Sequence, residues 1–377
     1  MKLNLKIIFI FLLSFLIIYI FLIKKKTINE FFNKNSTIRE IANSKISLIQ
    51  NLNTNTNYKI AKYFNDISYK IYENKIKSNK KILVSIASYR DSQCSITLND
   101  VINKAKYPEN LVIIICQQND FLDSNCEIDK VKNNSLATIK TIKIPYTYAK
   151  GPCWARFLIQ QLWDGEEYYL QIDSHTRFVD SWDEKCINCL QKIDYKKVCL
   201  TNYVSTFNIN TGEIEINPLR GEMFIESIDP RDGFFRYNSK YETSMLNSRE
   251  SKGWSGCFSF SSSQIIIDAP YDPYTPFLFF GEEMDIFARL YTRGWKMYVP
   301  NIPICFTIFD RSYRKTFWEH PDQAEIVQYS KLRLYLRFNL LDKKFVDLLP
   351  DIIKKDLDYF CLGKEKTFEE FLDYCSS

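Results

Sequence analysis

Residues 168–178 read YYLQIDSHTRF, and the fold is best approached from this stretch. The apolar run 168–172 predicts a buried strand that delivers Asp173 and His175 into a short polar turn. A carboxylate and an imidazole two residues apart in an extended turn can point to the same side and hold a divalent cation. The alternative is a polar turn whose two side chains are satisfied locally.

The flanking sequence alternates between strand-like and helix-like segments. Helices are predicted at 152–163, after Gly151, and at 181–193, where Ser181-x-x-Glu184 has the form of a capping box and makes Asp183 and Glu184 structural. Strands are predicted at 82–89, 111–118, 138–146, 168–172 and 198–203. Such alternation predicts an α/β fold with a mixed, mostly parallel sheet flanked by helices. Ligands bind at the carboxyl ends of such strands, where Asp173 and the segment 85–90 lie.

The second half of the chain is less regular. Residues 204–255 are polar and predict an irregular insertion suited to binding an acceptor, and 256–267 resemble a strand. The chain is expected to be helical from residue 321, with a final helix opened by the capping box Thr367-x-x-Glu370.

The amino terminus predicts a membrane anchor. Residues 7–23 are seventeen uncharged, mainly apolar residues between Lys6 and three lysines, which favours an uncleaved signal-anchor over a cleaved signal peptide. The expected organisation is an anchor (1–26), a stem (27–80), a catalytic domain (81–320) and a helical extension (321–377). A single-pass type II protein of the endoplasmic reticulum or Golgi is therefore expected, although lysines on both sides do not determine the orientation.

Composition excludes other classes of protein. The 50 basic residues are balanced by 45 acidic ones without a dense basic stripe, so no nucleic-acid partner is expected. Among eleven cysteines, Cys186 and Cys189 form the only C-x-x-C pair, and no second pair completes a zinc site. Two helix cysteines one turn apart are the favoured reading of that pair.

Five blocks in order carry a family resemblance. They are VSIASYRD (84–91), GPCWARFLIQQLW (151–163), YYLQIDSHTRF (168–178), YDPYTPFLFFGEE (271–283) and DRSYRKTF (310–317). Together they resemble the GlcNAc-transferase family that includes the hydroxyproline-linked protein GlcNAc-transferases. These are GT-A fold proteins distantly similar to polypeptide GalNAc-transferases, so the resemblance implies a GT-A, Rossmann-like domain.

The resemblance implies roles for residues that match the blocks. Asp173 and His175 would hold the metal, and Arg156 would face the nucleotide-sugar cleft. Arg311 and Arg314, two guanidiniums three residues apart, would close over the diphosphate. The loop after the first strand would cradle uracil and ribose through Ser85, Ala87, Ser88, Tyr89 and Arg90.

Two adjacent carboxylates and a tryptophan complete the candidate site. Glu282 and Glu283 could bind sugar hydroxyls, position the acceptor or share the role of general base. Asp173 would also take part in catalysis, through the metal that it holds. The alternative for both glutamates is a place in the first turn of a helix. Trp254 could stack on the sugar or lie in the core.

One position departs from the family. Relatives carry a third metal-ligating histidine a few residues before the arginines, where this chain has Thr307. A threonine hydroxyl is a poor ligand for Mn²⁺, and His320 lies too far along the chain to replace it.

The expected activity is metal-dependent transfer of GlcNAc, or a related sugar, from a UDP-sugar to a hydroxyl of a protein or glycan, with retention of configuration. Mn²⁺ is the expected cation, with Mg²⁺ as the other possibility. A catalytically weakened glycan-binding or scaffold protein is the alternative that Thr307 raises. A metal-dependent hydrolase of nucleotide sugars is a third, less favoured reading because no water-activating base is evident.

Overall fold

In the computed structural model, the described residues are 36–50, 52, 54–65, 67–73, 75–128, 136–214 and 219–376. The predicted anchor, 1–26, and the start of the predicted stem lie outside these residues. Within them, no helix is both long and apolar enough to cross a membrane.

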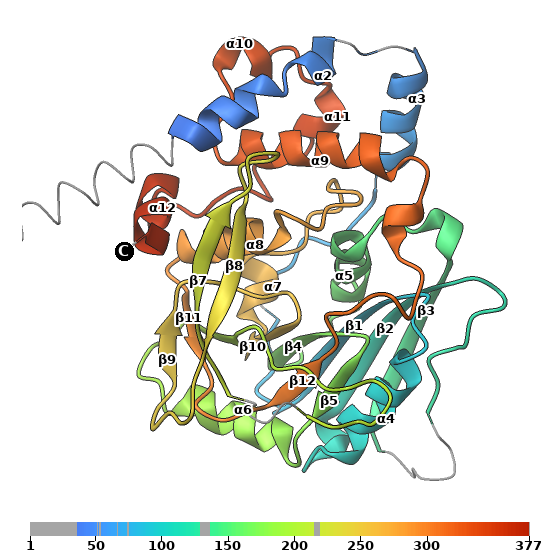
Figure 1. Ribbon diagram of the computed structural model, residues 1–377, viewed down its shortest axis with the longest axis vertical. Coiled ribbons are helices and arrows are strands. Elements are labelled where there is room, and N and C mark those ends of the chain that lie inside the picture. The colour runs from blue at the N-terminus through green and yellow to red at the C-terminus, as the bar shows by residue number, and fades with distance from the viewer. Residues whose placement is uncertain are drawn as a thin grey trace, which may run out of the picture.

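An eight-stranded mixed sheet forms the centre of the molecule (Figure 1). Its order is β3-β2-β1-β4-β10-β6-β11-β9, and β3, β2, β1 and β4 run parallel to one another. The strands are β1 (Ile82–Tyr89), β2 (Leu111–Asn119), β3 (Thr138–Pro145), β4 (Tyr168–Asp173), β6 (Val198–Thr201), β9 (Arg249–Ser251), β10 (Phe258–Ser262) and β11 (Lys296–Val299). A mixed, mostly parallel sheet flanked by helices is therefore confirmed.

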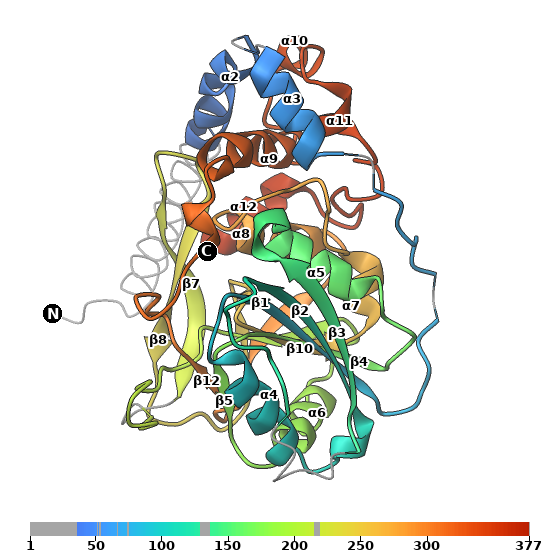
Figure 2. The same cartoon turned by 90° about the vertical axis from the view of Figure 1, so that its right-hand side faces the viewer.

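Strand alternation in β1 separates two cores. Ile82, Val84 and Ile86 face the core formed with α4 (Cys94–Asn103) and α6 (Trp182–Gln191), whereas Leu83 faces the core formed with α5 (Pro152–Gln160). Figure 2 shows α5 on one side of the sheet and α4 and α6 on the other. The central strands are apolar on both faces because helices cover both.

The two predicted capping boxes differ in outcome. At α12 (Phe368–Ser376) the box forms, because the Glu370 N–H donates to the Thr367 hydroxyl and the Thr367 N–H donates to the Glu370 carboxylate. At α6 it does not, since Ser181 has a positive φ of 57° and makes no side-chain cap. Asp183 is structural in another way: its carboxylate accepts the N–H groups of Lys106 and Tyr107.

The segment 204–255 is not the irregular insertion expected. It contains a long hairpin, β7 (Arg220–Ile228) and β8 (Phe235–Tyr241), as well as β9. The polar composition of this segment led to the wrong prediction of irregular structure, because a two-stranded ribbon exposes many of its side chains to solvent. The predicted strand 256–267 also ends early, at Ser262, and continues as α7 (Gln264–Asp268).

A helical cap covers one end of the sheet. It joins helical residues 36–44, α2 (Ser47–Gln50) and α3 (Thr54–Tyr63) to the carboxyl-terminal helices α9 (Gln323–Arg337), α10 (Lys343–Val346) and α11 (Asp351–Lys354) (Figure 1). Residues 36–64, within the segment 27–80 expected to be a stem, therefore pack on the rest of the molecule. Ile38, Ala42, Ile60, Tyr63 and Phe64 are buried in the same core as α5 and α9.

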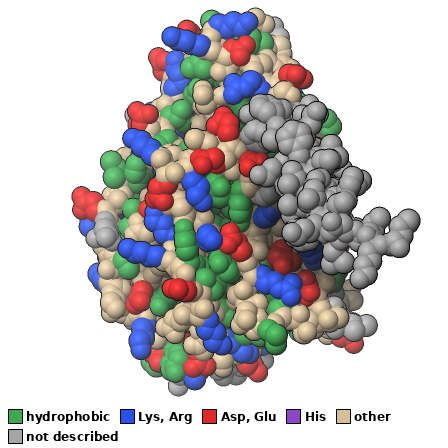
Figure 3. Space-filling model, turned by 90° about the vertical axis from the view of Figure 1, so that its left-hand side faces the viewer, with side chains coloured by type: hydrophobic (Ala, Val, Ile, Leu, Met, Phe, Trp, Pro, Cys, Tyr) green, Lys and Arg blue, Asp and Glu red, His purple; other side chains and the backbone are tan. Residues whose placement is uncertain are grey.

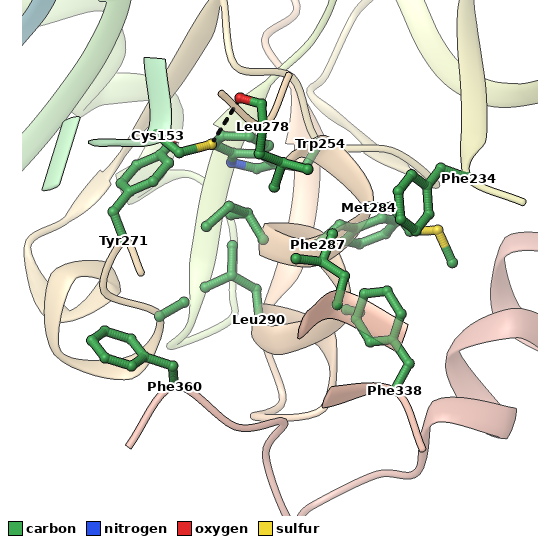
Figure 4. Close-up of a cluster of buried hydrophobic side chains, with 14 of the residues drawn as sticks. Cys153, Phe234, Trp254, Tyr271, Leu278, Met284, Phe287, Leu290, Phe338 and Phe360 are labelled. Atoms are coloured by element: carbon green, nitrogen blue, oxygen red, sulfur yellow. Dashed lines mark hydrogen bonds between the residues drawn. The ribbon is translucent and has the colours of Figure 1, made fainter. Parts of the chain in front are cut away.

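The core beneath the cap centres on α8 (Glu282–Tyr291). Figure 4 shows Met284, Phe287 and Leu290 of this helix among aromatic side chains that include Trp254, Phe338 and Phe360. The surface is different: over the face shown in Figure 3, basic and acidic side chains are interspersed rather than gathered by sign.

Replacement of Phe64 by alanine tests the cap. Phe64 is fully buried, so Phe64→Ala should lower the free energy of unfolding by about 3–5 kcal/mol, the range for deleting a buried aromatic side chain. Tyr58→Ala, at a site 70% exposed on the neighbouring helix α3, is the control and should change it little. Urea unfolding would measure both, and equal effects would show that residues 36–64 do not pack as described.

Candidate active site

A cavity of about 680 Å³ opens where the carboxyl ends of β1 and β4 face the β7–β8 hairpin. Cavities that bind small ligands are commonly roughly 300–1,000 Å³. Its lining comes from both halves of the chain: the segments 173–175 and 281–283, strand β8, and the loop after β12 (Cys305–Thr307). The short strand β5 (Thr176–Phe178) pairs with β12 and brings this loop beside the turn after β4.

Asp173 and His175 lie together in this cavity, and a third side chain orients the imidazole. His175 Nδ1–H donates to Asp91 Oδ2 at 2.7 Å, which leaves Nε2 facing Asp173, 3.7 Å from its Oδ2. A carboxylate on one imidazole nitrogen and a free second nitrogen form the arrangement that metal-binding histidines commonly use. Asp173 and His175 can therefore hold a cation between them.

Asp91 is the residue that reasoning from sequence missed. It also accepts the Ser174 hydroxyl at 2.7 Å, and Arg314 Nε lies 3.5 Å from its Oδ2. Burial by itself raises the pKa of this carboxyl, but His175 and Arg314 outweigh burial and hold the pKa below its ordinary value. The signal was present, because Asp91 directly follows Arg90 in the block VSIASYRD.

Arg156 links Asp173 to the adjacent glutamates. This buried guanidinium on α5 bonds to Glu282 and to the carbonyl of Gly256, and its Nη2 lies 3.3 Å from Asp173 Oδ1. Glu282 also accepts the Tyr271 hydroxyl at 2.5 Å. The Glu282 carboxylate is thus paired with Arg156 and Tyr271, and Arg156 also fixes the Asp173 carboxylate.

Glu283 is placed differently and faces the cavity. It accepts the Tyr203 hydroxyl at 2.5 Å and the N–H of Gly256 at 3.2 Å. Burial raises its pKa to about 7, against the two hydrogen bonds and together with the charge of Glu282. Both glutamates lie in the first turn of α8 and line the cavity, but Glu282 is the ion-pair partner of Arg156, whereas Glu283 bonds to Tyr203 and Gly256.

Arg311 and Arg314 both line the cavity on the loop after β12. The Arg311 guanidinium lies against the rings of Phe279 and Trp318, at 5.3 and 5.1 Å from their centroids. No carboxylate among the described residues forms an ion pair with it, and burial lowers its pKa. Its hydrogen-bonding edge is therefore available to an anion in the cavity.

Of the five residues expected in a loop after the first strand, only Arg90 follows β1, because the strand runs to Tyr89. Ala87 and Tyr89 line the cavity, whereas Ser85 and Ser88 are buried in the sheet. Arg90 points away from it: the backbone turns there with φ of 48°, and the guanidinium bonds to Asp123 over the Tyr146 ring. Two of its guanidinium nitrogens, Nε and Nη2, are thus paired with Asp123, and Arg90 is not among the residues that line the cavity.

Trp254 also does not reach the cavity. It is 1% exposed, and its indole N–H donates to Ser259 Oγ at 3.1 Å. Trp254 is therefore a core tryptophan, as the alternative prediction had it, and the prediction that it stacks on a sugar is wrong.

Position 307 supplies no third metal ligand. Thr307 is fully buried on β12, and its hydroxyl donates to the carbonyl of His175 at 3.3 Å. His320 packs instead between Tyr63 and Phe277. Across the described part of the chain, no three histidine, cysteine, aspartate or glutamate side chains are grouped to hold a metal, and this includes Cys186 and Cys189, both buried on α6.

A disulfide adjoins the site. Cys94 at the start of α4 is bonded to Cys126, in the loop after β2. The sequence did not indicate this pairing.

Comparison with solved structures gives the same architecture. A structure titled as GalNAc-T7 with UDP, GalNAc and Mn²⁺ superposes with a TM-score of 0.52 at 15% identity, over 77% of this chain. This chain spans 56% of the length of that protein. A Staphylococcus aureus TarS structure in complex with UDP-GlcNAc aligns at a TM-score of 0.40 and 12% identity, over 74% of this chain and 89% of that one. The first of these likenesses supports the GT-A-like fold.

Comparison by sequence gives the family. No curated protein sequence matches the chain. The family model described as Glycosyltransferase (GlcNAc), however, matches residues 81–140 and 129–376, which contain every cavity-lining residue. The chain therefore belongs to the GlcNAc glycosyltransferase family.

Proposed function

We propose that this protein transfers GlcNAc from UDP-GlcNAc to a hydroxyl of a protein or glycan in a metal-dependent reaction. One observation carries the proposal: a carboxylate–imidazole pair oriented by Asp91 shares one cavity with two arginines. That combination fits a diphosphate with its cation, because oxygen and nitrogen ligands hold the ion and guanidiniums bind phosphate oxygens. The UDP and Mn²⁺ in the structurally similar GalNAc-T7 complex support the same ligands here.

The residues fit a two-ligand metal site. Asp173 and His175 would hold Mn²⁺, or Mg²⁺ in its place, and Thr307 would not contribute because its hydroxyl is used by a backbone carbonyl. The bound cation would neutralise charge on the leaving diphosphate. With two side chains as ligands, most of the coordination sphere remains for water and phosphate oxygens.

The chain's own groups divide the remaining work. Arg311 and Arg314 would bind the diphosphate, while Arg156 and Glu282 would keep the Asp173 carboxylate in place. Glu283, with its pKa near 7, would exchange hydrogen bonds with a sugar or acceptor hydroxyl. We propose retention of configuration by a front-face path, in which the diphosphate oxygen accepts the acceptor's proton.

We also propose the location inferred from the amino terminus: a single-pass type II protein of the endoplasmic reticulum or Golgi, anchored by residues 7–23. The Cys94–Cys126 disulfide supports a lumenal catalytic domain, since disulfides persist in oxidising compartments.

Thr307 favours a second candidate function, a glycan-binding or scaffold protein with weakened catalysis. Release of UDP from UDP-GlcNAc in the presence of Mn²⁺ separates the two. Sustained release supports an enzyme, and binding of UDP-GlcNAc without release supports the scaffold.

Arg311→Ala should weaken UDP binding in the presence of Mn²⁺ by about 1.5–3 kcal/mol, the range for a hydrogen bond to a charged group. Titration calorimetry would measure the affinity. Arg249→Ala, at a site outside the cavity, is the matched control. Equal affinities in the two variants would place the diphosphate elsewhere.

Mn²⁺ and UDP should bind with strong mutual coupling, because two side chains leave most of the ion's ligands to phosphate and water. Titration of Mn²⁺ with and without UDP would measure the coupling. Asp173→Asn should remove it, and Asp164→Asn, at an 82% exposed surface side chain, should retain it. Binding of Mn²⁺ that depends on neither UDP nor Asp173 would contradict a metal site at residues 173–175 and favour the locally satisfied polar turn.

The raised pKa of Glu283 should appear in the pH dependence of stability. The folded chain keeps the Glu283 proton up to about pH 7, whereas an unfolded chain loses it near the ordinary glutamate value of 4.5. Wild type should therefore lose stability relative to Glu283→Gln as the pH rises from 5 to 7, with no further change above that. Thermal unfolding from pH 5 to 9 would follow the difference, with Glu213→Gln on the surface as control. Parallel curves for wild type and Glu283→Gln would contradict the raised pKa.

A further inference from the structure

A second group of buried charges lies beneath the helical cap, outside the cavity. Arg333 and Arg337, one turn apart on α9, are both buried, as are the carboxylates of Asp272 and Asp285. Arg333 donates to both oxygens of Asp272, from Nε at 2.6 Å and from Nη2 at 3.2 Å. Arg337 also bonds to Asp272, and its Nη1 donates to Asp285 Oδ1 at 2.5 Å. One side chain of the cap therefore joins two carboxylates from separate segments of the chain.

These two carboxylates stand next to a hydrogen bond of the cavity wall. Asp272 follows Tyr271, whose hydroxyl donates to Glu282 Oε1 at 2.5 Å. Asp285 lies three residues after Glu282 on α8, and so on the same side of that helix. Arg337 thus clamps the segment that carries Tyr271 to the helix that carries Glu282. The distance between the tyrosine hydroxyl and the glutamate depends on this clamp.

Tyr271 is also fixed by α5, the helix that carries Arg156. Its N–H donates to Gln160 Oε1 at 2.8 Å, one turn beyond Arg156. Its hydroxyl shares Oε1 of Glu282 with Arg156, whose Nη2 extends to Asp173 Oδ1 at 3.3 Å. That last contact is already long for a hydrogen bond, so a small shift of Arg156 toward Glu282 would break it.

We propose that Arg337 is a positioning residue for the metal ligand Asp173, and that Tyr271 is the link through which it acts. The inference rests on the proposed function, which makes Asp173 a ligand. Members of one buried ionic network are coupled, because a charge that loses one partner interacts more strongly with those that remain. When the clamp loosens, Glu282 loses the Tyr271 hydroxyl and draws Arg156 to itself, which leaves Asp173 without its anchor. The cap then helps to set the affinity of the site for its cation.

The test measures binding of Mn²⁺ to the full chain by titration calorimetry in the presence of UDP, below the unfolding temperature. Tyr271→Phe removes one hydroxyl and keeps the ring, and it should weaken Mn²⁺ binding about fivefold, a modest coupling for one ionic network. UDP binding without metal should not change, because Arg311 and Arg314 belong to another loop. Tyr274→Phe is the matched control: its hydroxyl, on a ring that is also buried, donates to Asp356, and Mn²⁺ affinity should stay the same.

Arg337→Lys tests the far end of the route. Lysine keeps the charge but lacks the planar fork that spans two carboxylates, so Mn²⁺ binding should again weaken about fivefold. Combined with Tyr271→Phe, it should weaken binding no more than the larger single effect, because both changes break one route. Arg293→Lys, at a partly buried arginine that bonds to two backbone carbonyls, is the control for a loss of stability alone and should leave Mn²⁺ affinity unchanged.

Three outcomes would overturn the inference and leave the proposed function standing, since wild type would bind the cation in each. The first is equal Mn²⁺ affinity in wild type, Tyr271→Phe and Arg337→Lys. The second is a pair of effects that add in the double variant. The third is tighter Mn²⁺ binding in either variant, because Arg156 would then neutralise Asp173 rather than position it. Wild type that binds no Mn²⁺ with UDP present would overturn the proposed function and this inference together.

Discussion

The position of the site depends on one buried, positively charged side chain, that of Arg156. The guanidinium of Arg156 is enclosed between Glu282 and Asp173 and also bonds to a backbone carbonyl. An unpaired charge in such surroundings would cost several kcal/mol, so the partners must remain in place. They come from α5, the end of β4 and the start of α8. Satisfying this one group therefore fixes how the sheet, its covering helix and the second half of the chain meet at the cavity.

A second carboxylate, Asp91, performs the same role for the imidazole. It fixes the His175 ring through Nδ1, holds the adjacent Ser174, and lies within reach of Arg314 on the loop across the cavity. The negative charge of Asp91 thus faces both the His175 imidazole and the Arg314 guanidinium. Thr307 leaves this frame intact, because Asp91 rather than the side chain at position 307 orients the His175 ring.

The two walls of the cavity differ in kind. The wall from β1 and β4 is the end of a sheet covered on both faces. The opposite wall is the two-stranded ribbon of β7 and β8. The helical cap joins both walls to one core, since residues from α3, α5 and α9 pack in the same cluster.

The sequence by itself determined those strands and helix ends that depend on local residue patterns. The apolar runs at 82–89, 111–118 and 168–172 specify strands because burial on both faces requires unbroken apolar residues, and Thr367 and Glu370 specify a helix start through their own backbone contacts. Tertiary structure alone decided where the remaining side chains point. Arg90 turns to Asp123, Trp254 enters the core, and Asp91 meets His175 across 84 residues. The sequence likewise did not predict the polar hairpin or the burial of the helices at 36–64. Their stability comes from partners far away in the chain rather than from their own residue pattern.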